Sequence, residues 1–152
     1  AVGSVDEASV ALGLARALIK SSKMQDILLK IQKQLYSLMS ELSATAETAD
    51  QFDFIHQEDV DWLEAKIDEL EGSLDMPREF ILPGGSPAGG ALALARTIVR
   101  RAERRATALF EADGFEKEIL IAYLNRLSSL VFILEIQAAS DSEQGLRFAK
   151  EE

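Results

Sequence analysis

Five arginines and one glutamate gather within ten residues of a chain that is otherwise acidic. Residues 96–105 read RTIVRRAERR and carry a local charge of +4, five arginines minus one glutamate. The whole chain carries −10, so the residues outside this segment carry −10 minus +4, or −14. Guanidinium groups form paired hydrogen bonds with phosphate oxygens. The segment is therefore a candidate site for a ligand that bears phosphate groups.

A helix would sort this segment into two faces. At about 100° per residue, one face carries the acid and three of the cations: Arg96, Arg100, Glu103 and Arg104. Arg101 and Arg105 lie between that face and the arc expected to meet the core, which holds Ile98, Val99, Ala102 and Ala106. Pairs at i,i+3 and i,i+4 would let Glu103 orient its arginine neighbours. Two interpretations stay open: a polyanion site, or a salt-bridged face exposed to solvent or to another subunit.

Two further segments bear on that choice. The loop LPGGSP, residues 82–87, ends at the start of the Arg-rich helix, where free N–H groups favour an anion. The same turn also makes an ordinary helix start. Asn125 and Arg126 interrupt an apolar helical pattern, and asparagine is unfavourable inside a helix unless its amide has a partner. These two residues form either part of a site or a polar pair that sets helix register.

Helical spacing of apolar residues accounts for nearly the whole chain. It predicts helices at about residues 4–20, from Ser22 to Leu42, and at about 58–71, 91–112 and 116–139. Ser4 and Glu7 have the spacing of a capping box for the first helix. We expect an all-α protein, a five-helix up-and-down bundle that is ferritin-like in general appearance. Residues 1–139 form its single domain, and residues 140–152 form a polar tail expected to fray.

The segment between residues 75 and 90 separates the third and fourth predicted helices. It holds all three prolines and four of the nine glycines. We expect an ordered loop here, because Phe80, Ile81 and Leu82 favour burial. No stretch alternates in hydropathy for long enough to predict a sheet.

Composition excludes several classes of protein. The chain has 152 residues and no cysteine, which excludes disulfides, thiolate zinc sites and a cysteine nucleophile. A single histidine, His56, excludes a metal cage built from several histidines. The net charge of −10 argues against general nucleic-acid binding. No apolar run approaches the roughly 18 residues that a membrane span needs, so we expect a cytoplasmic protein without a membrane partner.

Four blocks of sequence together resemble the PduO-type ATP:cob(I)alamin adenosyltransferases. They are GSVDEASVALGLA (residues 3–15), FILPGGS (80–86), ARTIVRRAERR (95–105) and YLNRLSSLVF (123–132). The similarity runs from residue 3 to residue 134 in the family's order and spacing. It implies a five-helix bundle assembled as a homotrimer, with active sites between adjacent subunits.

The resemblance also implies a reaction. Cob(I)alamin attacks the 5′ carbon of ATP, which yields adenosylcobalamin and expels triphosphate, with Mg²⁺ on the ATP phosphates and no protein side chain assigned to the metal. The residues implied to bind ATP are Arg100, Arg101, Glu103, Arg104 and Asn125, and those implied to be catalytic are Arg96, Arg100 and Asn125. Asp6 would pair with Arg96 across the subunit interface. Phe80 would crowd the lower face of the corrin.

The chain departs from the family pattern at identifiable positions. Ala93 stands where the family often has histidine, Ser129 replaces an aspartate, and Ile136 stands where arginine is common. A segment of the type TxxGDxGxT, which wraps the triphosphate in the family, is not in this sequence. We expect it upstream of Ala1, since the sequence lacks an initiator methionine. The alternatives are a non-catalytic corrinoid- or nucleotide-binding paralogue and a purely structural helical trimer.

Overall fold

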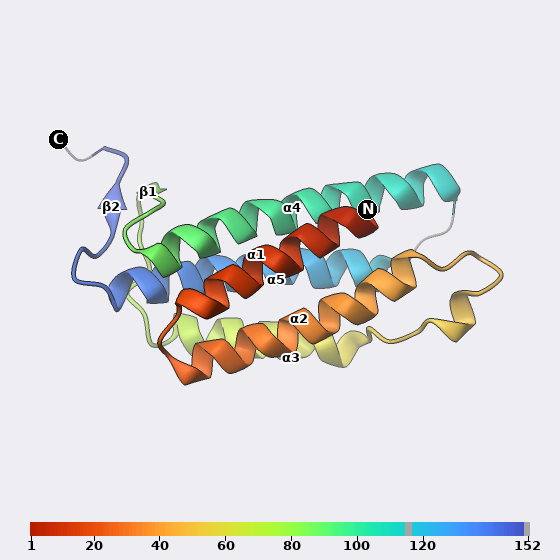
Figure 1. The fold of residues 1–152 in the computed structure, drawn as a ribbon, viewed down its shortest axis with the longest axis horizontal. Helices are drawn as coiled ribbons and strands as arrows, with labels where there is room; N and C mark the ends of the chain where they lie inside the picture. The colour runs from red at the N-terminus through yellow and green to blue at the C-terminus, as the bar shows by residue number, and fades with distance from the viewer. Residues whose placement is uncertain (115–116, 151–152) are drawn as a thin grey trace.

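Five helices make up most of the protein, as expected for an all-α bundle (Figure 1). The computed structural model describes residues 1–114 and 117–150. The helices are α1 (Val2–Leu18), α2 (Ser22–Leu42), α3 (Gln57–Glu71), α4 (Pro87–Asp113) and α5 (Glu118–Ser140). A short 3₁₀ turn, η1 (Ala49–Gln51), lies between α2 and α3.

The helices run along one long axis and successive helices reverse direction (Figure 1). Helix α1 packs against α2 and α4, and α5 packs against α4 and α3. By length and composition α5 could cross a membrane, but 61% of its most apolar stretch is buried in the bundle. Helix α5 is therefore a core helix of the bundle.

Local capping explains where the helices begin. Helix α4 starts at Pro87, four residues before the predicted start, because Ser86 accepts a hydrogen bond from Gly89 N (3.0 Å) and proline suits the first helical position. Ser21, the residue immediately before α2, accepts a hydrogen bond from Met24 N. The capping box predicted at Ser4 is wrong, since α1 already begins at Val2. The predicted first residue of the last helix, Glu116, lies outside the described residues.

Helix α1 carries apolar residues on two faces. Val5, Ala8, Leu12 and Ala15 are buried in the bundle. In contrast, Val10, Leu14 and Leu18 form a stripe that is 67%, 53% and 42% exposed. The helical spacing of these last three residues predicted the helix correctly, but they do not face the core of this chain.

The loop after α3 pairs with the end of the chain. Strand β1 (Ile81–Leu82) is antiparallel to β2 (Arg147–Phe148), and Ala149 N donates to Phe80 O at 2.8 Å. This pairing contradicts the expectation that this part of the tail frays. Residues 151–152 lie outside the residues that the structure describes. The expected burial of Phe80 is also wrong, because its side chain is 86% exposed.

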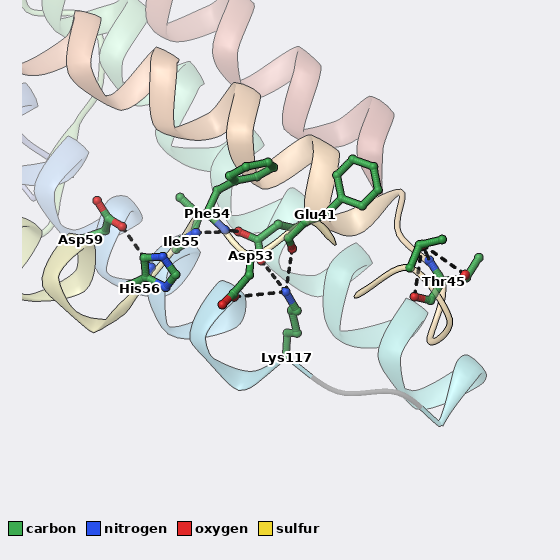
Figure 2. A network of polar contacts seen from close by, with 10 residues as sticks. Glu41, Thr45, Asp53, Phe54, Ile55, His56, Asp59 and Lys117 are labelled. Atoms are coloured by element: carbon green, nitrogen blue, oxygen red, sulfur yellow. Dashed lines mark hydrogen bonds and ion pairs between the residues drawn. The ribbon is translucent and has the colours of Figure 1, made fainter. Parts of the chain in front are cut away.

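A buried carboxylate fixes the loop between α2 and α3 (Figure 2). The Glu41 Oε1 atom accepts from Phe54 N (2.8 Å) and Ile55 N (2.6 Å), and its Oε2 accepts from Lys117 Nζ (2.8 Å). Lys117 also donates to Phe52 O at 2.8 Å. Because Lys117 immediately precedes α5, the network ties that helix to α2 and to the loop.

A second polar chain crosses the core. The buried Tyr123 hydroxyl on α5 donates to Gln34 Oε1 (2.8 Å), and Gln34 Nε2 donates to Asp59 Oδ1 (2.7 Å). Asp59 Oδ2 accepts from His56 N at 3.0 Å, which closes the start of α3. The chain therefore links α5, α2 and α3 through groups that are mutually satisfied.

Replacing Tyr123 by phenylalanine should lower the free energy of unfolding by about 1–3 kcal/mol, because it leaves Gln34 Oε1 without its donor. Denaturant unfolding followed by circular dichroism measures the change. Tyr36 provides the matched control, since it is 71% exposed and Tyr36→Phe should change stability by less than about 0.5 kcal/mol. Equal effects of the two variants would contradict the role given to the Tyr123 hydroxyl.

The same pair of tyrosines allows a titration. Burial, followed by the charge of Asp59, raises the pKa of Tyr123 well above 10.0. In the Tyr36→Phe variant Tyr123 is the sole tyrosine, so tyrosinate absorbance reports it alone and should stay low at pH 10. The unfolded chain releases this proton at about pH 10, so its contribution to stability is complete below that pH and is lost as pH rises further.

Candidate functional site

The Arg-rich segment forms one exposed face of α4, as its helical spacing predicted. Arg100 and Arg104 are exposed, whereas Val99, Ala102 and Ala106 are fully buried on the opposite side. The Arg104 Nη1 atom donates to Arg100 O at 3.2 Å, which places the two side chains on successive turns. This arrangement presents two guanidinium groups to solvent from a rigid helix.

Asn125 of α5 joins this face through Glu103. Its Nδ2 atom donates to Glu103 Oε1 at 3.0 Å, and its Oδ1 accepts from Arg126 Nη2 at 2.9 Å. An amide has two N–H groups and two acceptor lone pairs, so each end keeps capacity for a ligand. The acid and the cation together orient the Asn125 amide, which explains how asparagine is accommodated in the middle of α5.

These residues border a groove of about 560 Å³ between α3, α4 and α5. Glu103, Asn125 and Arg126 supply polar groups at its wall, while Phe110 and Ile121 supply apolar ones. A groove with apolar walls and a few converging polar groups has the general character of a small-molecule site. The lining also includes Glu64 and Glu118 but neither Arg100 nor Arg104, so the groove suits a flat neutral part of a ligand better than an anionic part.

Two arginines of the segment are engaged elsewhere. Arg101 forms an ion pair with Glu7 of α1, so it ties α1 to α4. Arg96 Nε donates to Glu135 Oε2 of α5 at 3.1 Å, and its guanidinium carbon lies 5.8 Å from the centre of the Phe132 ring. Neither Glu135 nor Glu7 was predicted from the sequence as a partner of these arginines.

Glu135 is a carboxyl group in an apolar environment. Burial raises its pKa above the ordinary value of 4.5, while the hydrogen bond and charge of Arg96 act in the opposite direction. A signal for it was present in the sequence, because it is the single charged residue in the apolar run LVFILEI (residues 130–136). A lone acid in such a run needs a cationic partner on a neighbouring helix.

The remaining predicted residues lie apart from this groove. Asp6 is exposed on α1 and Phe80 lies beside β1, at the end of the bundle where α4 begins (Figure 1). Arg100 is thirteen residues into α4 from Pro87, or about 20 Å at 1.5 Å per residue. The N–H groups at the start of α4 therefore cannot hold the same phosphate as Arg100.

The described residues contain no group of three or more acidic, histidine or cysteine side chains placed to hold a metal ion. This part of the chain does offer two exposed guanidinium groups on α4, those of Arg100 and Arg104, and the Asn125 amide of α5, which contacts the same helix through Glu103. Guanidinium groups bind anionic oxygens, and an amide can form hydrogen bonds with a heterocycle.

Sequence comparison places these features in context. The sequence profile of the cobalamin adenosyltransferase family matches residues 1–138. The corrinoid adenosyltransferase of Mycobacterium tuberculosis is 39% identical over 147 residues, which cover 94% of this chain and 76% of that protein. The corrinoid adenosyltransferase PduO of Citrobacter freundii is 37% identical over 145 residues, but the chain spans only 43% of its length.

Solved structures agree with the sequence comparison. A variant of the PduO-type ATP:corrinoid adenosyltransferase from Lactobacillus reuteri, complexed with cobalamin and ATP, superimposes with a TM-score of 0.88 at 31% identity. The superposition covers 99% of this chain and 84% of that one. A second variant of the same protein, complexed with ATP, gives a TM-score of 0.82 at 32% identity over 90% of this chain and 78% of that one.

Proposed function

Because this chain belongs to the cobalamin adenosyltransferase family, we propose that it transfers the 5′-deoxyadenosyl group of ATP to the cobalt of cob(I)alamin. The cobalt electron pair forms a bond to the 5′ carbon, the bond from that carbon to the phosphate oxygen breaks, and triphosphate leaves with the electrons. The observation that supports the proposal is the exposed face of α4 with Arg100 and Arg104, which is joined to Asn125 of α5 by the hydrogen bond from Asn125 Nδ2 to Glu103.

The arginines act on the leaving group. Triphosphate gains negative charge as the carbon–oxygen bond breaks, and fixed cations stabilise charge that develops in a transition state. Arg100 and Arg104 meet this requirement from a rigid helix, so little reorganisation is needed. Mg²⁺ would enter with ATP, bound to its phosphate oxygens, and would neutralise part of the same charge. We expect the protein to carry out this reaction in the cytoplasm.

Asn125 would hold the nucleoside part of ATP. Its amide retains a free N–H and a free lone pair after its contacts with Glu103 and Arg126. Glu103 contributes by orienting that amide. With these roles, the adenosine would bind near α5 and the triphosphate would lie along α4.

We further propose that the active protein is a homotrimer. The exposed apolar stripe of Val10, Leu14 and Leu18 supports an interface, and Leu94 adds a further exposed apolar side chain on α4, which packs against α1. Asp6 lies four residues before Val10 and so shares the face of that stripe. This position suits an ion pair between Asp6 and Arg96 of a neighbouring subunit.

Phe80 would act at the corrin. Its ring is 86% exposed, and its carbonyl accepts a hydrogen bond from Ala149 N, so the backbone that carries the ring is anchored. A ring on an anchored backbone could press against the lower face of the corrin. Crowding there favours loss of the lower cobalt ligand, which makes reduction to cob(I)alamin easier.

The direct test is turnover under strict reduction. The protein should convert cob(I)alamin to adenosylcobalamin only when ATP and Mg²⁺ are present, as followed by the absorbance of the corrinoid. Asn125→Ala should lower the rate roughly 100-fold, the usual effect of removing one polar group aimed at the reacting ligand. Ser129→Ala, one turn further along α5, is the matched control and should retain activity.

Calorimetric titration with ATP separates the alternatives. A protein that binds ATP but gives no adenosylcobalamin would be a non-catalytic nucleotide-binding paralogue. A protein that does neither would be a structural helical trimer. Full activity in Asn125→Ala would remove Asn125 from the site.

A further inference from the structure

Glu135 is a buried acid that the reaction outlined above does not use. Its side chain is 3% exposed, and its Oε1 atom has no hydrogen-bond partner among the described residues. Burial of a carboxylate is costly unless a cation compensates it. Its placement therefore needs an explanation beyond the stability of the bundle, because an apolar side chain would suit the same position.

The compensating cation is Arg96, and the contact is directional. The Nε atom donates to Glu135 Oε2 at 3.1 Å, so the carboxylate occupies the inner edge of the guanidinium. The Phe132 ring lies 5.8 Å from the guanidinium carbon, within the range of a cation–π contact. An inner hydrogen bond and a ring together define the plane and the direction of the guanidinium.

The outer edge of the guanidinium stays available. Among residues 1–114 and 117–150, neither Nη group of Arg96 makes a hydrogen bond, and the side chain is 25% exposed. A planar fork with one edge fixed presents its two Nη groups in a set direction.

Glu135 also adjoins the loop that carries Phe80. Together with Ile81, Gly85 and Gly145 it lines a small cavity of about 10 Å³ under that loop. The loop is closely fitted there, because a Cβ atom on Gly85 would lie 2.6 Å from Gly145 O. Glu135 thus lies between the cation and the corrin-facing loop.

We propose that Glu135 is a positioning residue, which holds Arg96 by its inner edge so that the Nη groups face the intersubunit active site. The inference rests on the proposed function, in which Arg96 pairs with Asp6 of a neighbouring subunit. Its role is orientation rather than charge at the triphosphate, since the carboxylate offsets the charge of the arginine it holds.

Replacement of Glu135 tests the idea in graded steps. Glu135→Gln keeps an acceptor for Nε and should lower kcat/KM by about 3-fold, whereas Glu135→Leu removes the acceptor and should lower it by about 30-fold. The thermal midpoint of Glu135→Leu should change little, because Arg96 is 25% exposed and can stay hydrated without its partner, and because the unsatisfied buried Oε1 atom is removed as well. A residue with only a structural role would lose activity and stability together.

A double-mutant cycle with Arg96→Lys shows whether the effect passes through the arginine. Lysine has no Nε–H on an inner edge, so Glu135→Leu should cause less than a 2-fold further loss in that background. An undiminished loss of about 30-fold there would overturn the proposal.

A readout without turnover keeps this test separate from the test of the reaction. In the ¹⁵N NMR spectrum of the whole protein, the Arg96 Nε–H should exchange slowly with solvent, and its resonance is assigned by its absence in Arg96→Lys. Glu135→Leu should broaden or remove it. Failure of adenosyl transfer with a protected Nε–H would reject the proposed function alone, whereas an Nε–H unaffected by Glu135→Leu would reject the positioning role.

Discussion

Replacing Arg100 by alanine should lower the rate of adenosyl transfer by roughly 100- to 1,000-fold, the effect of removing one preorganised group that stabilises developing charge. Arg100 is exposed on the face of α4 that also carries Glu103, and its neighbour Arg104 donates to its carbonyl at 3.2 Å. The loss should appear mainly in kcat, because the charge on triphosphate grows as the bond to the 5′ carbon breaks.

Two variants calibrate this expectation. Arg105→Ala removes the same charge from an exposed position on another part of the helix, so it should retain activity within about 2-fold. Arg100→Lys keeps the positive charge but loses the paired N–H donors of the guanidinium, so its rate should lie between those of Arg100→Ala and the unchanged protein. Steady-state assays with ATP and cob(I)alamin measure all three. Equal losses in Arg100→Ala and Arg105→Ala would mean that total charge, not the site, controls the rate.

The largest loss of stability is expected from Glu41→Ala, at about 3–5 kcal/mol, the cost of breaking a buried pair by removing one partner. The variant leaves Lys117 Nζ without its buried carboxylate and leaves Phe54 N and Ile55 N without their acceptor. These groups lie where α2, the α2–α3 loop and the start of α5 meet (Figure 2). Unpaired groups at that junction should loosen all three.

Denaturant unfolding at a fixed protein concentration measures this loss, since the stability of the proposed trimer would depend on concentration. Glu47→Ala is the matched control, because Glu47 is exposed in the same loop and its removal should change stability by less than about 0.5 kcal/mol. A Glu41→Ala protein as stable as Glu47→Ala would show that the network contributes nothing to the fold.

Much of the fold was predictable because it depends on residues close together in the chain. Helical spacing identified all five helices, and α4 ends at Asp113, one residue past its predicted end, where Gly114 adopts the αL conformation (φ 64°). The exposed face of Arg100 and Arg104 follows from the same periodicity. The type of site was predicted by residue chemistry, since clustered guanidinium groups suit phosphates.

Other features depend on contacts between residues far apart in the chain. Val10 and Leu14 have the spacing of a core stripe, but α1 buries Leu12 and Ala15 instead, and a helix with two apolar faces cannot reveal which one meets its own chain. The pairing of Ile81 with Phe148 likewise has no local signal, because each strand has only two residues.

The sequence alone determined five helices and a cationic face, and it predicted a phosphate-binding chemistry, because side-chain type and helical period are local properties. Only the tertiary structure decided that Asn125 is oriented by Glu103, that Arg101 is engaged by Glu7, and that the lone acid Glu135 holds Arg96. Each of these pairs joins two helices, so its existence depends on how the helices pack and rotate against one another. That rotation is set by the burial of the whole apolar core and not by the residues of the pair.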